Sequence, residues 1–98
     1  MTITTSREGE KMQIVLEGRL DTTTAPQLEV ELKRSISGIT ELIFDFAGLE
    51  YISSAGLRVL LAAQKVMNKQ GSLTIRNVNS VVMEVFEITG FVDILTIE

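Results

Sequence analysis

The first twenty residues alternate between hydrophobic and polar side chains. The alternation begins at Ile3, is interrupted around Gly9, and resumes with Met12, Ile14 and Leu16. A period of two places every second side chain on the same face of a strand. Two such stretches joined by a short turn predict an antiparallel β-hairpin.

Three later segments have hydrophobic residues three or four positions apart, the spacing of a helix that packs by one face. Their expected starts are residues 21–26, Ser54 and Ser80, and their expected stops are Gly38, Gly71 and Gly90. The residues expected on the inner faces of the first and third helices are Ala25, Leu28, Leu32 and Ile36, and Val82, Val85 and Phe86.

The remaining hydrophobic runs are short enough to be strands. Leu42–Phe46, ended by Ala47 and Gly48, is nearly continuous and suits a central strand buried on both faces. Runs at 73–75 and 94–97 predict two more strands. The order ββαβαβαβ predicts one α/β domain over residues 1–98, with a mixed central sheet and helices packed on one of its faces.

Composition narrows the range of functions. The chain has no cysteine and no histidine, and its net charge is -4. The usual general base and the commonest transition-metal ligand are therefore missing, and an acidic chain is poorly suited to nucleic-acid phosphates. No segment approaches the about 20 apolar residues of a membrane span. We expect a cytoplasmic binding protein rather than an enzyme, with no cofactor, metal site, nucleic-acid partner or membrane insertion.

The helix predicted from Ser54 carries hydrophobic residues on two sides. At 100° per residue, the residues expected to face the core are Val59, Leu60, Ala63, Val66 and Met67. Leu57 and Leu61 fall on the wetter side with Arg58 and Lys65, an arrangement that resembles a docking stripe. The alternative is that a neighbouring helix, or the loop after Gly18, covers both leucines.

Ser53 and Ser54 open this helix, where serine is also a favoured N-cap. They belong to a stretch, residues 43–57, that reads Ile-Phe-Asp-Phe-Ala-Gly-Leu-Glu-Tyr-Ile-Ser-Ser-Ala-Gly-Leu. This stretch resembles the signature of bacterial anti-sigma factor antagonists, whose shared module is the STAS domain. Residues 17–21 followed by Thr24 and Ala25 are similar to the family's Gly-x-Leu-Asp turn before its first helix. The resemblance spans essentially the full chain.

The resemblance implies that a serine at the start of the second helix is phosphorylated by a cognate anti-sigma factor. Aligned on Gly56, that residue is Ser54. Two residues depart from the family pattern: Ser53 stands where the family has aspartate, and Ala55 replaces a second hydroxyl. Ser53 is therefore the second choice for the phosphorylated residue. The unphosphorylated protein would bind an anti-sigma factor with a GHKL-type ATPase domain and release the sigma factor, and a PP2C-type phosphatase is a candidate for removing the phosphate. The residues expected to meet the partner are Asp21, Thr22, Thr23, Ser53, Ser54, Ala55, Gly56, Leu57, Arg58, Leu61 and Lys65.

Other functions stay open at this point. The departures at Ser53 and Ala55 also fit a separate STAS subunit that regulates a membrane transporter without phosphorylation. A nucleotide-binding module is a third class, although no glycine-rich phosphate loop occurs. Asp21 and the threonines after it could simply cap a helix, and Arg58 could simply be solvated. The sequence does not decide between a monomer and a weak dimer.

Overall fold

The computed structural model describes all residues from Met1 to Glu98 and has the predicted order of strands and helices. The elements are β1 (Thr2–Glu8), β2 (Lys11–Leu20), α1 (Ala25–Ser35), β3 (Glu41–Ile52), α2 (Ser54–Gln70), β4 (Ser72–Arg76), α3 (Ser80–Thr89), the 3₁₀ turn η1 (Phe91–Asp93) and β5 (Thr96–Ile97). The fold class inferred from the hydrophobic pattern is therefore confirmed. None of the helices has the length and hydrophobicity that a membrane crossing would require.

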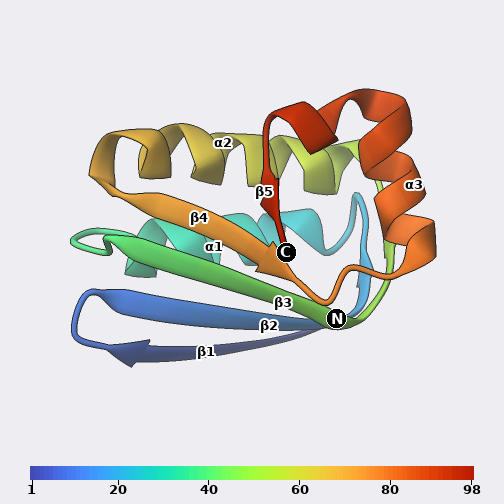
Figure 1. Ribbon diagram of the computed structural model, residues 1–98. Coiled ribbons are helices and arrows are strands. Elements are labelled where there is room, and N and C mark those ends of the chain that lie inside the picture. Colours follow the sequence, from blue (N-terminus) through green and yellow to red (C-terminus); the bar gives the residue numbers. More distant parts are fainter.

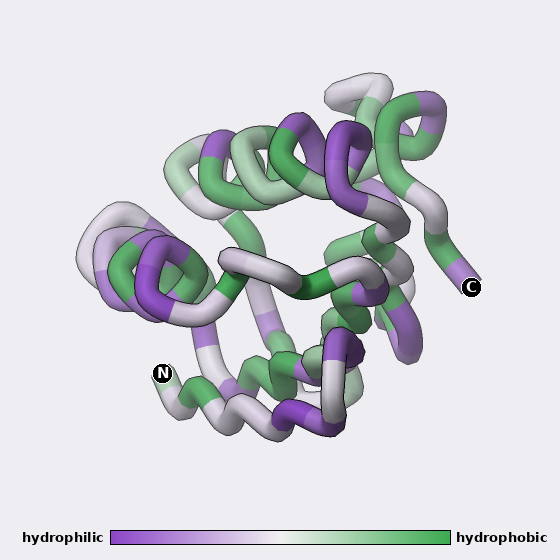
Figure 2. The backbone as a smooth tube through the Cα atoms, turned by 90° about the vertical axis from the view of Figure 1, so that its left-hand side faces the viewer, coloured by the Kyte–Doolittle hydropathy of each residue, from purple (hydrophilic) through white to green (hydrophobic).

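One five-stranded mixed sheet organises the domain, with the strands in the spatial order β1-β2-β3-β4-β5. β1 pairs antiparallel with β2, and the other neighbours pair in parallel through helical crossovers. α1 and α2 lie behind the sheet, and α3 stands near the end of α2 at which that helix begins (Figure 1). Alternating hydrophobic and hydrophilic segments along the helices in Figure 2 reflect their amphipathic spacing.

The core lies between the helices and one face of the sheet. Met12, Ile14 and Leu16 of β2 are buried there, as the alternation predicts. Phe44 and Phe46 of β3 and Phe86 of α3 are fully buried, and the ring of Phe46 lies 5.8 Å from that of Phe44 and 6.4 Å from that of Phe86 between centroids. These rings join α3 to the central strand.

The central strand is longer than the sequence predicts. Ala47 and Gly48 do not end β3, which continues to Ile52. The pairing with β2 instead shifts at two irregularities, the first between Val15 and Glu17 and the second between Gly18 and Arg19. A Cβ at Gly48 would lie 2.8 Å from Cγ of Glu17, so glycine allows the backbone to pass closely at this bulge. Ala47 and Gly48, which were expected to end the strand, lie at a bulge within it instead.

Residues at the ends of α3 and α2 fix these helices to the rest of the domain. Asn79, not Ser80, caps α3: its Oδ1 accepts a hydrogen bond from the backbone N–H of Val82, while its Nδ2 donates to the carbonyl of Leu49 at 2.6 Å. Gly90 ends α3 with φ of 79°, as predicted. At the end of α2, a Cβ on Gly71 would overlap the carbonyl of Thr40, so only glycine fits there.

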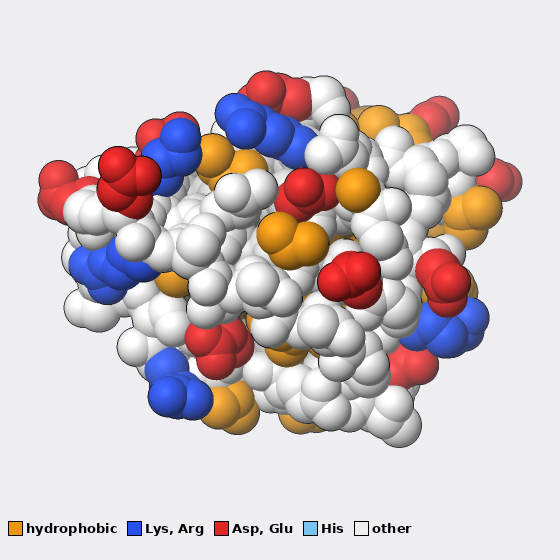
Figure 3. Space-filling model, turned by 90° about the horizontal axis from the view of Figure 1, so that it is seen from below, with side chains coloured by type: hydrophobic (Ala, Val, Ile, Leu, Met, Phe, Trp, Pro, Cys, Tyr) orange, Lys and Arg blue, Asp and Glu red, His pale blue; other side chains and the backbone are white.

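The surface seen from the side of β1 and β2 shows no large hydrophobic patch. Charged side chains of both signs are scattered over it, and the hydrophobic ones form small, separate groups (Figure 3). The residues of β1 are almost all exposed.

Candidate docking site at the start of α2

The start of α2 is held against the end of β2. Leu20 and Ile52 are paired across the two parallel strands, and the backbone N–H of Ser53 donates to the carbonyl of Leu20 at 2.9 Å. A Cβ on Gly56 would lie 2.7 Å from Cγ of the fully buried Leu20. Asp21, which follows Leu20, and Ser53, which follows Ile52, therefore begin their segments side by side.

The loop between β2 and α1 is organised by Asp21. Its carboxylate oxygen Oδ1 accepts hydrogen bonds from the hydroxyl of Thr23 at 2.8 Å and from the backbone N–H groups of Thr23 and Thr24 at 3.0 and 3.2 Å. The Thr23 hydroxyl is the main reason why the pKa of Asp21 is lowered, and partial desolvation opposes it. Thr24 occupies the N-cap of α1, but its side chain makes no capping hydrogen bond, so the prediction of a side-chain cap is wrong: the bonds to Asp21 fix the turn before the helix.

The lowered pKa predicts how Asp21 contributes to stability at different pH. Because the folded pKa lies below the unfolded value, the charged side chain stabilises the fold above about pH 3.9, the ordinary pKa of aspartate. This contribution is lost as the pH falls through the lower folded pKa. We expect the difference in unfolding free energy between the wild type and Asp21→Asn, from urea titrations, to be constant near neutral pH and to shrink in acid. A pH-independent difference would contradict the assignment.

The two serines at the start of α2 differ in exposure. Ser54 is the first residue of the helix and is exposed. Ser53 occupies the N-cap with extended backbone angles, but its Oγ caps no N–H group and is buried without a hydrogen-bond partner. Ser54 is therefore open to solvent, whereas the Ser53 hydroxyl is not.

The surroundings of Ser54 favour a negative charge. The first turn of α2 contains no acidic residue, so the partial positive charge of the helix N-terminus is not compensated. Arg58 lies one turn further along, is exposed, and forms no ion pair. Arg58 also lines an open hollow of about 260 Å³ together with Thr22, Pro26 and Ala55. This hollow brings together predicted partner-binding residues from both helix starts.

The prediction that Leu57 and Leu61 form an exposed docking stripe is wrong. Leu57 keeps only 6% of its surface exposed and belongs to the core, and Leu61 is half-buried. Gly56 is buried as well. The helix is covered on more than one side, which was the alternative that the sequence left open. Its outward face is formed instead by Ser54, Arg58, Ala62, Lys65 and Lys69.

The comparisons with known proteins agree with this geometry. The family model described as "Mlab, STAS domain" matches residues 3–96. BtrV of Bordetella bronchiseptica, described as an anti-sigma factor antagonist, is 42% identical over 84 residues, which cover 84% of this chain and 72% of BtrV. The chain belongs to the STAS-domain family of anti-sigma factor antagonists. The anti-sigma-B factor antagonist of Bacillus subtilis strain 168 is 31% identical and is matched over 88% of this chain and 80% of its own length.

Solved structures share the fold of this STAS domain. An anti-sigma factor antagonist from Mycobacterium paratuberculosis superimposes with a TM-score of 0.88 at 20% identity, over 98% of this chain and 83% of its own. The phosphorylated form of the Bacillus protein SpoIIAA superimposes with a TM-score of 0.77 at 20% identity, over 99% and 91%. At this level of identity the likeness concerns the fold.

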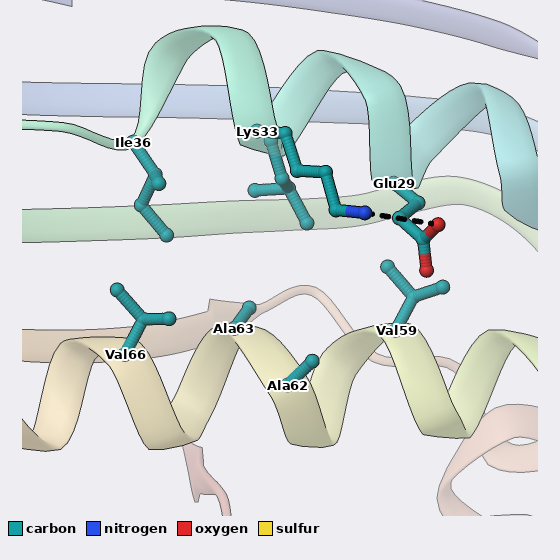
Figure 4. A pocket seen from close by; sticks show the side chains of 8 residues that line it. Glu29, Lys33, Ile36, Val59, Ala62, Ala63 and Val66 are labelled. Carbon is teal, nitrogen blue, oxygen red and sulfur yellow. Dashed lines mark ion pairs between the residues drawn. The ribbon is translucent and has the colours of Figure 1, made fainter.

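A second hollow of this STAS domain lies further along the two helices. Glu29 and Lys33 of α1, and Ile36 just after its end, face Val59, Ala62, Ala63 and Val66 of α2 across a groove of about 140 Å³ (Figure 4). Glu29 and Lys33 form an ion pair of 3.6 Å at its rim. Glu29 and Val59 line both hollows, so the groove continues from the start of α2.

The sequence did not identify this groove. Val59 is in the core as expected and also forms part of the wall, but Val66, which was expected in the core as well, is 37% exposed. The only sequence signal was the pair Ala62 and Ala63, whose small side chains leave space between the valines. Glu29 gave no signal at all, because its place in the groove depends on how α1 lies against α2.

Proposed function

We propose that this protein is an anti-sigma factor antagonist that works by binding, without catalysis. In its unphosphorylated form it binds an anti-sigma factor with a GHKL-type serine kinase domain and thereby releases a sigma factor. Phosphorylation of Ser54 switches the binding off. The observation that carries this proposal is the exposed hydroxyl of Ser54 at an acid-free helix start, beside a second serine whose hydroxyl is buried.

The docking face of this proposal combines the two helix starts. It consists of Thr22 and Thr23 in the loop, Ser54 and Arg58 on α2, and the exposed side chain of Lys65 two turns further on. The hollow lined by Thr22, Ala55 and Arg58 gives the partner a place to insert a side chain. Leu57 and Gly56 are buried and do not contact the partner. They hold the start of α2 against the core.

A phosphate at Ser54 changes binding rather than folding. It adds about 1.5 to 2 negative charges at a helix N-terminus, where N–H groups and the helix dipole stabilise an anion. The same charge would have to lose its water when the partner covers the docking face, which is unfavourable. The fold is therefore kept while the affinity falls.

The experiment that tests the proposal is a kinase reaction with the purified cognate anti-sigma factor and ATP, followed by peptide mass mapping. We expect phosphate on Ser54 in the wild type, no phosphate in Ser54→Ala, and nearly unchanged incorporation in Ser53→Ala, because the Ser53 hydroxyl is buried. Phosphate on Ser53 would show that the kinase remodels the helix start and would contradict the assignment to Ser54. A PP2C-type phosphatase is expected to reverse the modification.

The alternative is a separate STAS subunit that regulates a membrane transporter and is not phosphorylated. Ser53 and Ala55, which replace the aspartate and the second hydroxyl of the family pattern, favour it. On this alternative, the protein purified from its native cells carries no phosphate in any growth condition and is recovered with transporter subunits. Either proposal places the protein in the cytoplasm.

A further inference from the structure

α3 carries two largely exposed hydrophobic side chains, and between them a third, Val85, that is half-buried and packs against the core. Val81 is 54% exposed and Ile88 is 77% exposed, and Val85 between them is half-buried. Their spacing of four and three residues places them in one row along the helix, beside the row that contains the buried Val82 and Phe86. We call Val81, Val85 and Ile88 the α3 ridge. A row of this kind is typical of a surface that packs against another helix.

The charge beside the α3 ridge has a single sign. Residues 77–98 contain Glu84, Glu87, Asp93 and Glu98 and no lysine or arginine, so this segment accounts for the whole net charge of the chain. Glu98 is paired with Arg76, but Glu84, Glu87 and Asp93 form no ion pair. At 100° per residue, Glu84 flanks the ridge directly, and Glu87 lies further around the helix on the same side. The unpaired carboxylates leave the ridge with an acidic border.

We propose that the α3 ridge binds a basic amphipathic helix of another protein. The hydrophobic row supplies the apolar contact, and Glu84 and Glu87 attract lysine or arginine beside the partner's apolar face. A second copy of this chain fits poorly, because two α3 ridges facing each other would bring like charges together. An anionic lipid surface would be repelled by the same carboxylates. The contact involves none of the residues of the docking face around Ser54, so variants of one surface leave the residues of the other unchanged.

The test is a titration of the full chain, followed by amide NMR, with two synthetic helical peptides. One peptide has leucine along one face and lysine elsewhere, and the other has glutamate in place of lysine. We expect the leucine–lysine peptide to shift the amide signals of α3, and the leucine–glutamate peptide to leave them unchanged. Raising the salt concentration should weaken the binding, and Glu84→Gln with Glu87→Gln should weaken it too.

Matched variants distinguish binding at the α3 ridge from nonspecific hydrophobic binding. Ile88→Ser should lower the affinity for the leucine–lysine peptide about tenfold. The reason is that Ile88 is largely exposed in the free protein and its hydrophobic surface would be buried in the complex. Val30→Ser on α1 removes a valine that is 56% exposed, much like Val81, and should leave the affinity unchanged. The proposal is overturned if both peptides bind equally, or if the shifts spread beyond α3. It is also overturned if α3 signals change with protein concentration alone or on addition of phosphatidylglycerol vesicles.

Discussion

Replacement of Ser54 by aspartate is expected to weaken the complex with the anti-sigma factor about 100-fold, or about 2.8 kcal/mol. The carboxylate would stand on the exposed face of α2, where the partner has to remove its water. The folded domain should be unaffected, because the first turn of α2 has no other acidic residue and its N-terminus favours an anion. Calorimetric titration with the purified anti-sigma factor, together with a thermal unfolding curve, measures both quantities.

A matched control for this variant exists in the same chain. Ser80 is also exposed and is also the first residue of a helix, α3. Ser80→Asp therefore adds the same charge at the start of a helix that is not part of the proposed docking face, with Glu84 instead of Arg58 one turn further on, and should leave the affinity unchanged. Ser54→Ala should also bind like the wild type, because it adds no charge. If Ser54→Asp binds as tightly as the wild type, Ser54 does not control this contact.

Removal of the Phe46 ring is expected to lower the unfolding free energy by about 3 to 5 kcal/mol. Phe46 is fully buried and its ring lies between those of Phe44 and Phe86, so Phe46→Ala leaves a cavity where β3 meets α3. Urea unfolding measures the loss, and hydrogen exchange should show α3 amides opening more readily than those of β2. The smaller change Phe46→Leu should cost clearly less, because it keeps most of the volume.

The double variant shows whether the Phe46 ring holds α3 through Phe86. Phe46→Ala and Phe86→Ala share one cavity, so their combined effect should fall short of the sum of the single effects. Additive losses would mean that the two rings stabilise the domain separately. In that case α3 is held mainly by its other contacts, such as the hydrogen bond from Asn79 to the carbonyl of Leu49.

Local patterns predicted most of the fold because they depend on neighbours in the sequence. The alternation of Met12, Ile14 and Leu16 specifies which face of β2 is buried, and Gly90 ends α3 where its left-handed backbone was expected. The extent of β3 was not predictable in this way. Gly48 is equally compatible with a turn and with a bulge, and only the close approach of Glu17 on β2 decides between them.

At the start of α2, too, some features could be predicted from the sequence and others depend on the tertiary structure. The sequence by itself determined the position of this helix, the pair Ser53 and Ser54 at its start, and the family to which the chain belongs. Helical periodicity gives the angles between residues, but it does not say how many neighbours pack around the helix. The tertiary structure decided that Leu57 is buried, that the outward face runs through Arg58, and that one serine hydroxyl is exposed while the other is not. Exposure is set by contacts between segments far apart in the chain, and these contacts exist only in the folded protein.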